Sequence, residues 1–132
     1  MEHQRNRPAN IQLVDNWSDS WKETLAMLDE LGQREVLRLD DEGWLSARQN
    51  LMVAFEGSRA VGYLCFHVSP VIENGAALTQ GGRTITEAVV DGEGSIPDAA
   101  RTITRQLREA SMHRALELRC ARFRWEAAPA EV

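Results

Sequence analysis

Apolar residues along this chain follow two patterns, a helical spacing of three or four residues and short continuous runs. The first helical pattern follows Ser20 and Glu23, which fit a capping box, and precedes Gly32, a common stop after a helix. It predicts an amphipathic helix over about residues 20–31. The buried face of this helix is expected to hold Trp21, Leu25, Leu28 and Leu31.

A second long helix is predicted from residue 97 to about residue 113. It opens on Ser95-Ile96-Pro97-Asp98, a capping-box pattern with proline in the first turn. Its buried stripe is expected to hold Ala99 or Ala100, then Ile103, Leu107 and Ala110. Acidic residues 40–42 predict the cap of a further short helix that carries Trp44 and Leu45.

Continuous apolar runs predict four strands, over residues 51–55, 60–68, 84–90 and 115–120. The first two are joined by Glu56-Gly57-Ser58-Arg59, a hairpin turn in which glycine supplies the unusual dihedral angle. The strand over 60–68 is apolar on both faces, so it is expected at the centre of a covered sheet. Residues 71–82, with two glycine-containing turns, predict a loop or a loose hairpin.

The predicted order is therefore α-α-β-β-β-α-β, which places the chain in the α+β class. At 132 residues it is expected to form one domain, over residues 11–126. Residues 1–10 are interpreted as a flexible lead and residues 127–132 as a disordered tail.

Composition excludes several classes of protein. No apolar run approaches the roughly 20 residues that span a bilayer, and the start lacks the apolar core of a signal peptide, so we expect a cytoplasmic protein with no membrane association. Cys65 and Cys120 both lie in apolar runs and are interpreted as free buried thiols. The three histidines are scattered, and no Cys/His cluster has the spacing of metal ligands, so no metal is expected.

The net charge of −5 is unevenly distributed along the chain. Between residues 101 and 124 there are seven arginines against two acidic residues, Glu109 and Glu117. Such a run is typical of a solvated helix face beside an exposed edge strand, and the alternative is a surface for an anionic ligand or an acidic partner. Nucleic-acid binding requires aromatic residues among the arginines, and only Phe123 and Trp125 are present, so the pattern disfavours it.

The junction between the strand over 84–90 and the following helix is the main candidate for chemistry. A strand that leads into the N-terminus of a helix presents free backbone N–H groups and the positive end of the helix dipole to an anion. Here the connection is Asp91-Gly92-Glu93-Gly94, followed by the capping-box pattern. The predicted cap would satisfy the N–H groups internally, and Pro97 would remove one of them.

Three passages resemble the GNAT superfamily of N-acetyltransferases. Residues 52–64 are similar to its valine-alanine, acidic-turn, valine-glycine-tyrosine hairpin, and residues 85–91 to its fourth strand. The helix from Pro97 and the strand over 115–118 fall where the family has its third helix and fifth strand. The resemblance implies an α+β fold with a mixed, mostly antiparallel sheet, without the C-terminal helix and last strands of the family.

The resemblance also implies a set of functional residues. The segment that would hold acetyl-CoA contains Val89, Val90, Ser95, Asp98, Ala99 and Ala100. Glu87 lies in the strand where some members place a general base that acts through water. The family often carries a tyrosine that protonates the departing thiolate. Tyr63, the one tyrosine in this chain, is a candidate for that role, and the alternative is a packing role at the edge of the core. His67 is a further candidate base, and the alternative interpretation is an interior histidine with satisfied hydrogen bonds.

The chain departs from the family in its diagnostic motif, Arg/Gln-x-x-Gly-x-Gly/Ala. Aligning Val90-Asp91 with the family's Val-Asp places Ser95 at the first position, Asp98 at the first glycine and Ala100 at the second. Asp98 would bring a negative charge and a Cβ atom where the family brings bare backbone to the cofactor's phosphates. These departures predict impaired or lost binding of acetyl-CoA.

The strand expected over 115–125 would be an unprotected edge of the sheet. Unpaired N–H and C=O groups along such an edge invite another chain to pair with it. We therefore expect a homodimer, or a partner protein that pairs along Ala115–Trp125.

Three functions remain open. The first is a GNAT-like domain that acts as an interaction or regulatory module, with acetyl-CoA binding impaired or lost. The second is an active N-acetyltransferase that transfers acetyl from acetyl-CoA to an amine. The third is an unrelated α+β dimer of a ligand-binding or chaperone type. Acetyl-CoA and no cofactor at all are equally compatible with these patterns.

Overall fold

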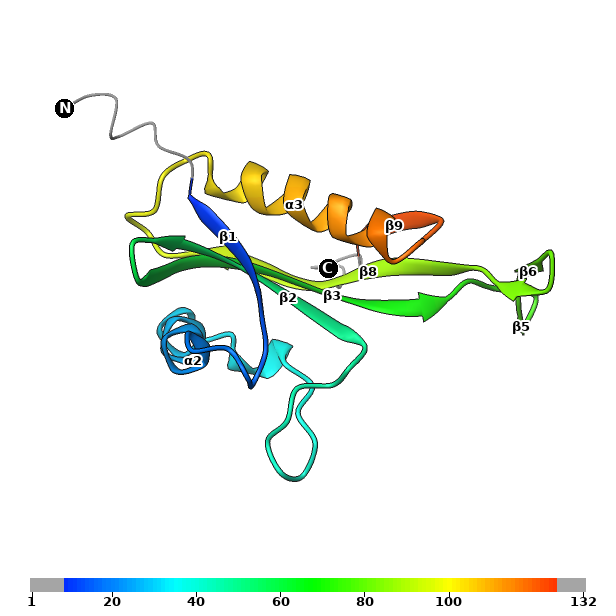
Figure 1. Cartoon of the computed structure of the whole chain (residues 1–132), viewed down its shortest axis with the longest axis horizontal. Coiled ribbons are helices and arrows are strands. Elements are labelled where there is room, and N and C mark those ends of the chain that lie inside the picture. Colours follow the sequence, from blue (N-terminus) through cyan, green and yellow to red (C-terminus); the bar gives the residue numbers. More distant parts are fainter. Residues whose placement is uncertain (1–8, 126–132) are drawn as a thin grey trace, which may run out of the picture.

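The structure is a computed structural model that describes residues 9–125, so the predictions made for the first eight and last seven residues lie outside it. A five-stranded sheet has one long helix on each face (Figure 1). The strands are β1 (Asn10–Val14), β2 (Gln49–Glu56), β3 (Arg59–Pro70), β8 (Thr86–Ser95) and β9 (Arg122–Trp125). The helices are α2 (Trp21–Leu31), α3 (Ile103–Glu117) and a single 3₁₀ turn, η1 (Arg34–Val36).

The strands lie in the order β1-β2-β3-β8-β9. The first four are antiparallel to their neighbours, and β9 runs parallel to β8 after the crossover through α3. The prediction of an α+β fold with a mixed, mostly antiparallel sheet is confirmed.

The core lies on both faces of the two central strands, β2 and β3. Leu64 and Phe66 are fully buried on the face that α3 covers, together with Ile103 and Leu107 from the helix. Tyr63 and Cys65 are buried on the opposite face, under α2 and η1. The expected central position of β3 is therefore confirmed, because side chains pack against it from both sides.

The β2–β3 hairpin and α2 agree with their patterns. Gly57 has a φ of +66° in the hairpin turn, and Gly32 has a φ of +68° just after α2 ends. The prediction of a capping box at the start of α2 is wrong, because Ser20 makes no side-chain capping hydrogen bond. Glu23 instead accepts a hydrogen bond from the backbone N–H of Ala60, at 3.1 Å, and so ties the helix to the hairpin.

Two N-terminal elements differ from the prediction. Strand β1, at the edge of the sheet, was not predicted, because four of its five residues are exposed or half-buried and show no strong apolar run. The short helix expected near residues 40–45 is also wrong. The Asp40 carboxylate accepts hydrogen bonds from the N–H groups of Glu42 and Trp44, so this cap-forming residue closes a turn and starts no helix.

The segment between β3 and β8 forms two small hairpins that extend beyond the rest of the molecule (Figure 1). They consist of β4 (Ile72–Glu73), β5 (Ala76–Ala77), β6 (Thr79–Gln80) and β7 (Arg83–Thr84). All eight of these strand residues are exposed. The expectation of a loose hairpin is confirmed, and the segment contains two of them.

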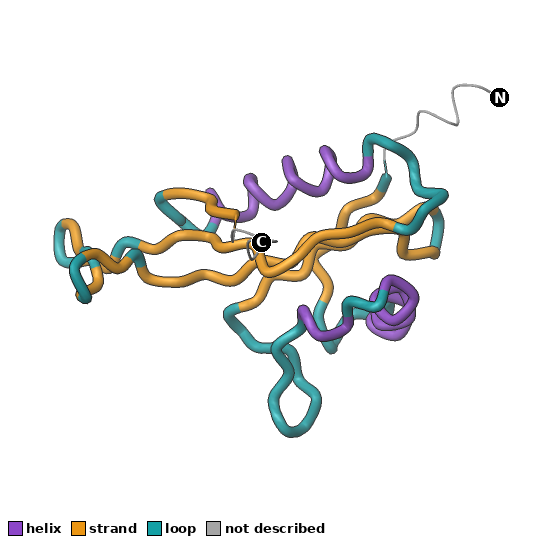
Figure 2. Tube along the Cα trace, turned by 180° about the vertical axis from the view of Figure 1, so that it is seen from behind, coloured by secondary structure: helices purple, strands orange, loops and turns teal. Residues whose placement is uncertain are grey.

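The largest correction concerns β8 and α3. Strand β8 continues through Gly92 and Gly94 to Ser95, and α3 begins six residues later than predicted (Figure 2). The two glycines pair in register with Cys65 and Tyr63 of β3 and remain extended. At the other end, residues 115–117 are still helical and Arg119 has a φ of +63°, so the last strand begins only at Arg122.

Candidate functional site

A β-bulge in β8 builds the main polar cluster of the sheet. Cys65 of β3 pairs with Gly92 and the next residue, Phe66, pairs with Val90, so Asp91 is the extra residue on β8. The Asp91 side chain is 9% exposed and lies on the face of α2 and η1. Bulges often redirect one side chain in this way.

Asp91 is paired with His67 of the neighbouring strand. The distance between His67 Nδ1 and Asp91 Oδ1 is 2.8 Å, and the side chain of His67 is 16% exposed. Because a carboxylate can only accept, the imidazole donates through Nδ1. A neutral His67 then keeps the lone pair of Nε2, which is the form that a general base requires.

Gln49, at the start of β2, fixes the position of Asp91. Its Nε2 donates to Asp91 Oδ2 at 3.0 Å and to the carbonyl of Val36, and its Oε1 accepts from the backbone N–H of Arg38 at 2.7 Å. The amide is therefore locked by contacts to β8 and to the chain around η1. The Arg38 side chain adds an ion pair to Asp91 at 3.5 Å.

Sequence reasoning named His67 but missed its partner. The sequence pattern places Asp91 just after the strand predicted over 84–90, and 24 residues separate it from His67, so nothing local connects the two. The signal that was available is an acidic residue directly after the apolar run Ala88-Val89-Val90 and directly before a glycine. Its burial could not be inferred without the bulge.

Glu87, the predicted base, lies four residues before Asp91 on β8, on the same face of the sheet as His67. It is 4% exposed and binds Arg122 at 2.7 Å and Arg124 at 3.2 Å. Burial alone would raise the pKa of Glu87, but hydrogen bonds from Arg124 and Arg122 outweigh it and leave the pKa below its ordinary value. A lowered pKa makes a carboxylate a weaker proton acceptor. The geometry gives Glu87 a clear role in joining β8 to β9, and its catalytic role stays a prediction.

Tyr63 lies in the core, 1% exposed, and its hydroxyl group is hydrogen-bonded to the Gln33 side chain. Burial, together with nearby negative groups, holds its pKa well above the usual range. Its ring occupies the space that the missing side chains of Gly92 and Gly94 leave free. Tyr63 is therefore packed in the core, and its catalytic role stays a prediction.

The predicted cofactor residues are spread over a strand and a loop. Val89 and Val90 are buried in β8, and Ser95 is its last residue. The loop over 96–102, which contains no glycine, carries Asp98, Ala99 and Ala100. The alignment of these residues with a helix start is therefore wrong, because α3 begins after all of them.

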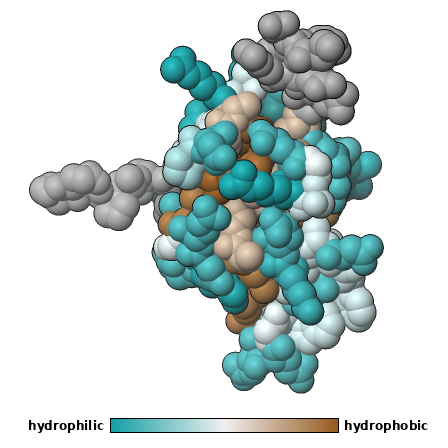
Figure 3. Space-filling model, turned by 90° about the vertical axis from the view of Figure 1, so that its left-hand side faces the viewer, coloured by the Kyte–Doolittle hydropathy of each residue, from teal (hydrophilic) through white to brown (hydrophobic). Residues whose placement is uncertain are grey.

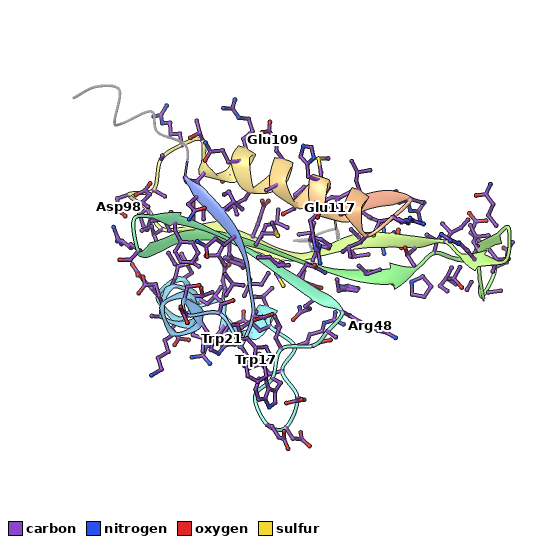
Figure 4. All side chains as sticks on the ribbon, viewed as in Figure 1. Trp17, Trp21, Arg48, Asp98, Glu109 and Glu117 are labelled. Carbon is purple, nitrogen blue, oxygen red and sulfur yellow. The ribbon has the colours of Figure 1, made fainter. Side chains whose placement is uncertain are left out.

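The predicted capping box on α3 is wrong as well. Asp98 is exposed and forms an ion pair with Arg59 of the hairpin at 3.2 Å. The residue that precedes the helix is Thr102, and it makes no side-chain capping hydrogen bond. Figure 4 shows Asp98 at the hairpin end of the sheet. The carboxylate therefore does not occupy the helix N-terminus.

The first turn of α3 is left open. Ile103 N–H donates to the Ala100 carbonyl, whereas the N–H groups of Thr104 and Arg105 have no acceptor within the described part of the chain. Arg101 and Arg105 are exposed and form no ion pair with any residue between 9 and 125. Viewed from this end, the surface is mostly hydrophilic, with a narrow hydrophobic band (Figure 3). Free N–H groups beside two guanidinium groups suit a phosphate.

Arg108, in the second turn of α3, links three elements. Its guanidinium binds the Glu93 carboxylate through two hydrogen bonds and lies 4.6 Å from the centre of the Trp125 ring. Helix α3 is thereby held against both β8 and β9.

Other expected features are reported for residues 9–125 only. Cys65 and Cys120 are free and buried, as predicted, and burial raises the pKa of both thiols. Among these residues, no group of three or more His, Cys, Asp and Glu side chains could hold a metal ion. No helix in this range has the length and apolar character to cross a membrane.

Comparison with known proteins identifies the fold. No protein-family model and no curated protein sequence matches this chain. Among solved structures, a ribosomal-protein-alanine N-acetyltransferase from Brucella melitensis biovar Abortus 2308 superposes with a TM-score of 0.67 at 14% identity, over 95% of this chain and 84% of that chain. The aminoglycoside N-acetyltransferase AAC(6')-Iy, solved in complex with CoA, gives 0.62 at 13%, over 93% and 82%.

A protein described as a transcriptional regulator from Bacillus halodurans C-125 matches with a TM-score of 0.60 at 16% identity, over 93% of this chain and 84% of that chain. This chain therefore has the fold of the GNAT acetyltransferases, as the sequence resemblance implied. At these identities the likeness establishes the fold, and the activity has to be argued from the site.

Proposed function

We propose that this protein is an acyl-CoA-dependent N-acyltransferase in which the His67–Asp91 pair acts as general base. The observation that carries the proposal is the buried carboxylate of Asp91, 2.8 Å from His67 Nδ1, in the strand that the resemblance assigns to cofactor binding. A buried acid that orients a histidine is a recurrent arrangement for proton abstraction. A surface histidine without such a partner would not support the same inference.

The residues at the start of α3 fit the phosphates of the cofactor. Two N–H groups are open there, Arg101 and Arg105 supply positive charge, and Asp98 is turned toward Arg59. The loop has no glycine, but Ala99 and Ala100 keep its side chains small. In this arrangement the Asp98 carboxylate does not block the N-terminus of α3.

Bound acyl-CoA would supply an activated thioester carbonyl. His67 Nε2 would accept the proton of the acceptor amine as the C–N bond forms and the C–S bond breaks, and Asp91 would stabilise the resulting imidazolium. The departing thiolate would take its proton from solvent. The hydrogen bond from Gln49 would keep Asp91 in place throughout.

Calorimetric titration with CoA and acetyl-CoA tests the cofactor site. We expect micromolar binding by the native chain and a loss of about tenfold or more in the double variant Arg101→Glu, Arg105→Glu, because two phosphate contacts become repulsive. Arg83→Glu makes one substitution of the same kind, with half of this charge change, in the distant β6–β7 hairpin and is expected to change the affinity little. Absence of binding by the native chain would contradict the proposal.

His67→Gln separates the base from the cofactor site. The variant is expected to bind CoA as the native chain does and to lose most of its acyl transfer, measured as release of free CoA with a panel of amines. A variant that binds CoA and keeps full turnover would overturn the role of His67.

The alternative is an interaction module with impaired or lost cofactor binding, favoured by the glycine-free loop over 96–102. Within that proposal, β9 is the edge along which a homodimer or another partner would pair, because it is the last strand of the sheet. The position of this edge is corrected from Ala115–Trp125 to Arg122–Trp125. Absence of CoA binding in the titration, together with dimerisation in solution, would favour this alternative.

A further inference from the structure

Two tryptophans form an exposed aromatic platform beside the start of β2. The rings of Trp17 and Trp44 lie 4.9 Å apart between centroids and are tilted by 35°. Trp17 is 80% exposed and Trp44 is 38% exposed. Figure 4 shows Trp17 on the α2 side of the sheet, next to the loop that connects η1 to β2. Such exposure is costly for large apolar rings and marks a candidate binding surface.

The two loops that carry the platform are held rigidly together. The Asn16 side chain donates to the Gly43 carbonyl at 2.9 Å and accepts from the Leu45 N–H at 2.6 Å. A ligand that stacks on these rings therefore meets a surface that is already ordered. Entropy lost on binding is correspondingly small.

Each tryptophan also has a carboxylate fixed beside it. Asp15 Oδ1 accepts the backbone N–H of Trp17, and Asp40 Oδ1 accepts the backbone N–H of Trp44, both at 2.9 Å. The second oxygen of each carboxylate makes no hydrogen bond within the described residues. Over residues 15–48 the chain has nine acidic against four basic side chains. The segments that carry the platform are thus acidic overall, whereas residues 101–124 are rich in arginine.

The platform borders a hollow that shares one residue, Gln49, with the His67–Asp91 cluster. The hollow has a volume of about 320 Å³ and is lined by both tryptophans, Asp15, Leu13, Gln49 and Arg114, among others. Gln49 is paired in register with His67 on the adjacent strand and hydrogen-bonded to Asp91. Neighbouring strands lie about 5 Å apart, so the hollow opens within one or two strand spacings of the proposed base.

We propose that the Trp17–Trp44 platform binds a small molecule that carries two or more protonated amines. A cation over the face of a tryptophan is attracted by the ring, and the fixed carboxylates add complementary charge. The volume of the hollow fits a small molecule and excludes a folded protein. One amine bound here would leave another to reach His67. The role of this molecule as acyl acceptor depends on the proposed acyl transfer, whereas the binding does not.

Spermidine is the probe that tests the platform, titrated into the full chain without CoA and followed by calorimetry. Trp17→Ala is expected to weaken binding about threefold to tenfold. Asp15→Asn and Asp40→Asn keep the oxygen that accepts the backbone N–H and remove the charge, so each is expected to weaken binding about threefold. Leu116→Ala removes a comparably exposed apolar side chain from α3 and serves as the control, with no expected change.

An uncharged diol of matching length distinguishes an amine site from a merely apolar patch. Equal affinity for the diol and spermidine would overturn the proposal, as would unchanged spermidine binding by Trp17→Ala. Binding of a lysine-rich peptide without binding of spermidine would overturn it too, since the surface would then be a protein interface. Because CoA is absent, failure of this test and failure of the CoA titration are separate results.

Discussion

Glu87 is a carboxylate that folding removes from water and surrounds with two guanidinium groups. Its side chain is 5% exposed, whereas Arg122 and Arg124 are about half exposed. The partners therefore remain partly screened by solvent, and the interaction is weaker than that of a fully buried pair. Removing the charge of Glu87 leaves the arginines hydrated, but it breaks the polar connection between β8 and β9.

We expect Glu87→Gln to lower the free energy of unfolding by about 2 kcal/mol at pH 7. The pKa of Glu87 is lower in the folded chain than its ordinary value of 4.5, so this stabilisation is present above pH 4.5 and is lost as the pH falls through the folded pKa. Urea unfolding of both proteins from pH 7 to pH 3 should show the difference shrinking below pH 4.5. A difference that is independent of pH would contradict this account.

Glu117→Gln is the matched control for that measurement. Glu117 pairs with Arg114 at 3.4 Å and is 68% exposed. A surface pair of this kind contributes less than about 1 kcal/mol. The control is therefore expected to unfold almost as the native chain does at every pH.

At the scale of elements, glycines in β8 allow η1 to approach the sheet. A Cβ atom on Gly92 would lie 2.7 Å from Val36 Cγ2 of η1 and 3.0 Å from the Tyr63 hydroxyl group. Neither contact is possible without movement. Gly92 is therefore required by packing, although its place next to Asp91 gave it the appearance of a turn residue.

Gly92→Ala is expected to destabilise the protein by about 1–3 kcal/mol, because the added methyl group pushes η1 away from the strand. Combining it with Val36→Ala removes the nearest obstacle, so the double variant should lose less than the sum of the two single variants. Thermal unfolding of all four proteins forms the cycle that measures this coupling. Additive losses would show that the contact with Val36 is not the cause.

At the scale of the whole molecule, the hairpins β4–β5 and β6–β7 lie outside the packed domain. Their strand residues are exposed. Val71, just before the hairpins, and Ile85, just after them, are adjacent, because Val71 N–H donates to the Ile85 carbonyl at 2.8 Å. Residues 72–84 thus extend the β3–β8 hairpin, and half-buried Leu78 bonds back to Val71 and Ile85.

Replacing residues 72–84 by Asn-Gly should close β3 onto β8 directly, because the flanking residues already pair and this dipeptide favours a two-residue hairpin turn. We expect the free energy of unfolding to change by less than about 1 kcal/mol. Circular dichroism during urea unfolding checks this expectation. Loss of cooperative unfolding would show that the hairpins do support the fold.

The sequence by itself determined the elements whose pattern is local. Helix α2, the β2–β3 hairpin and the central position of β3 follow from periodicity and a glycine turn, and the resemblance carried by residues 52–64 and 85–91 led to the correct fold. Each of these depends on residues close together in the chain, or on apolar runs that require cover on both faces.

Tertiary structure alone decided the site. The bulge at Asp91 shifts the register between β8 and β3 by one residue, and the resulting cluster joins His67, Gln49 and Asp91 from three strands. Near the start of α3, Asp98 likewise pairs with Arg59, 39 residues away, and lies in the loop before the helix. Contacts between distant residues outweighed the local preferences that predicted a capping box and a turn, and no local pattern records such contacts.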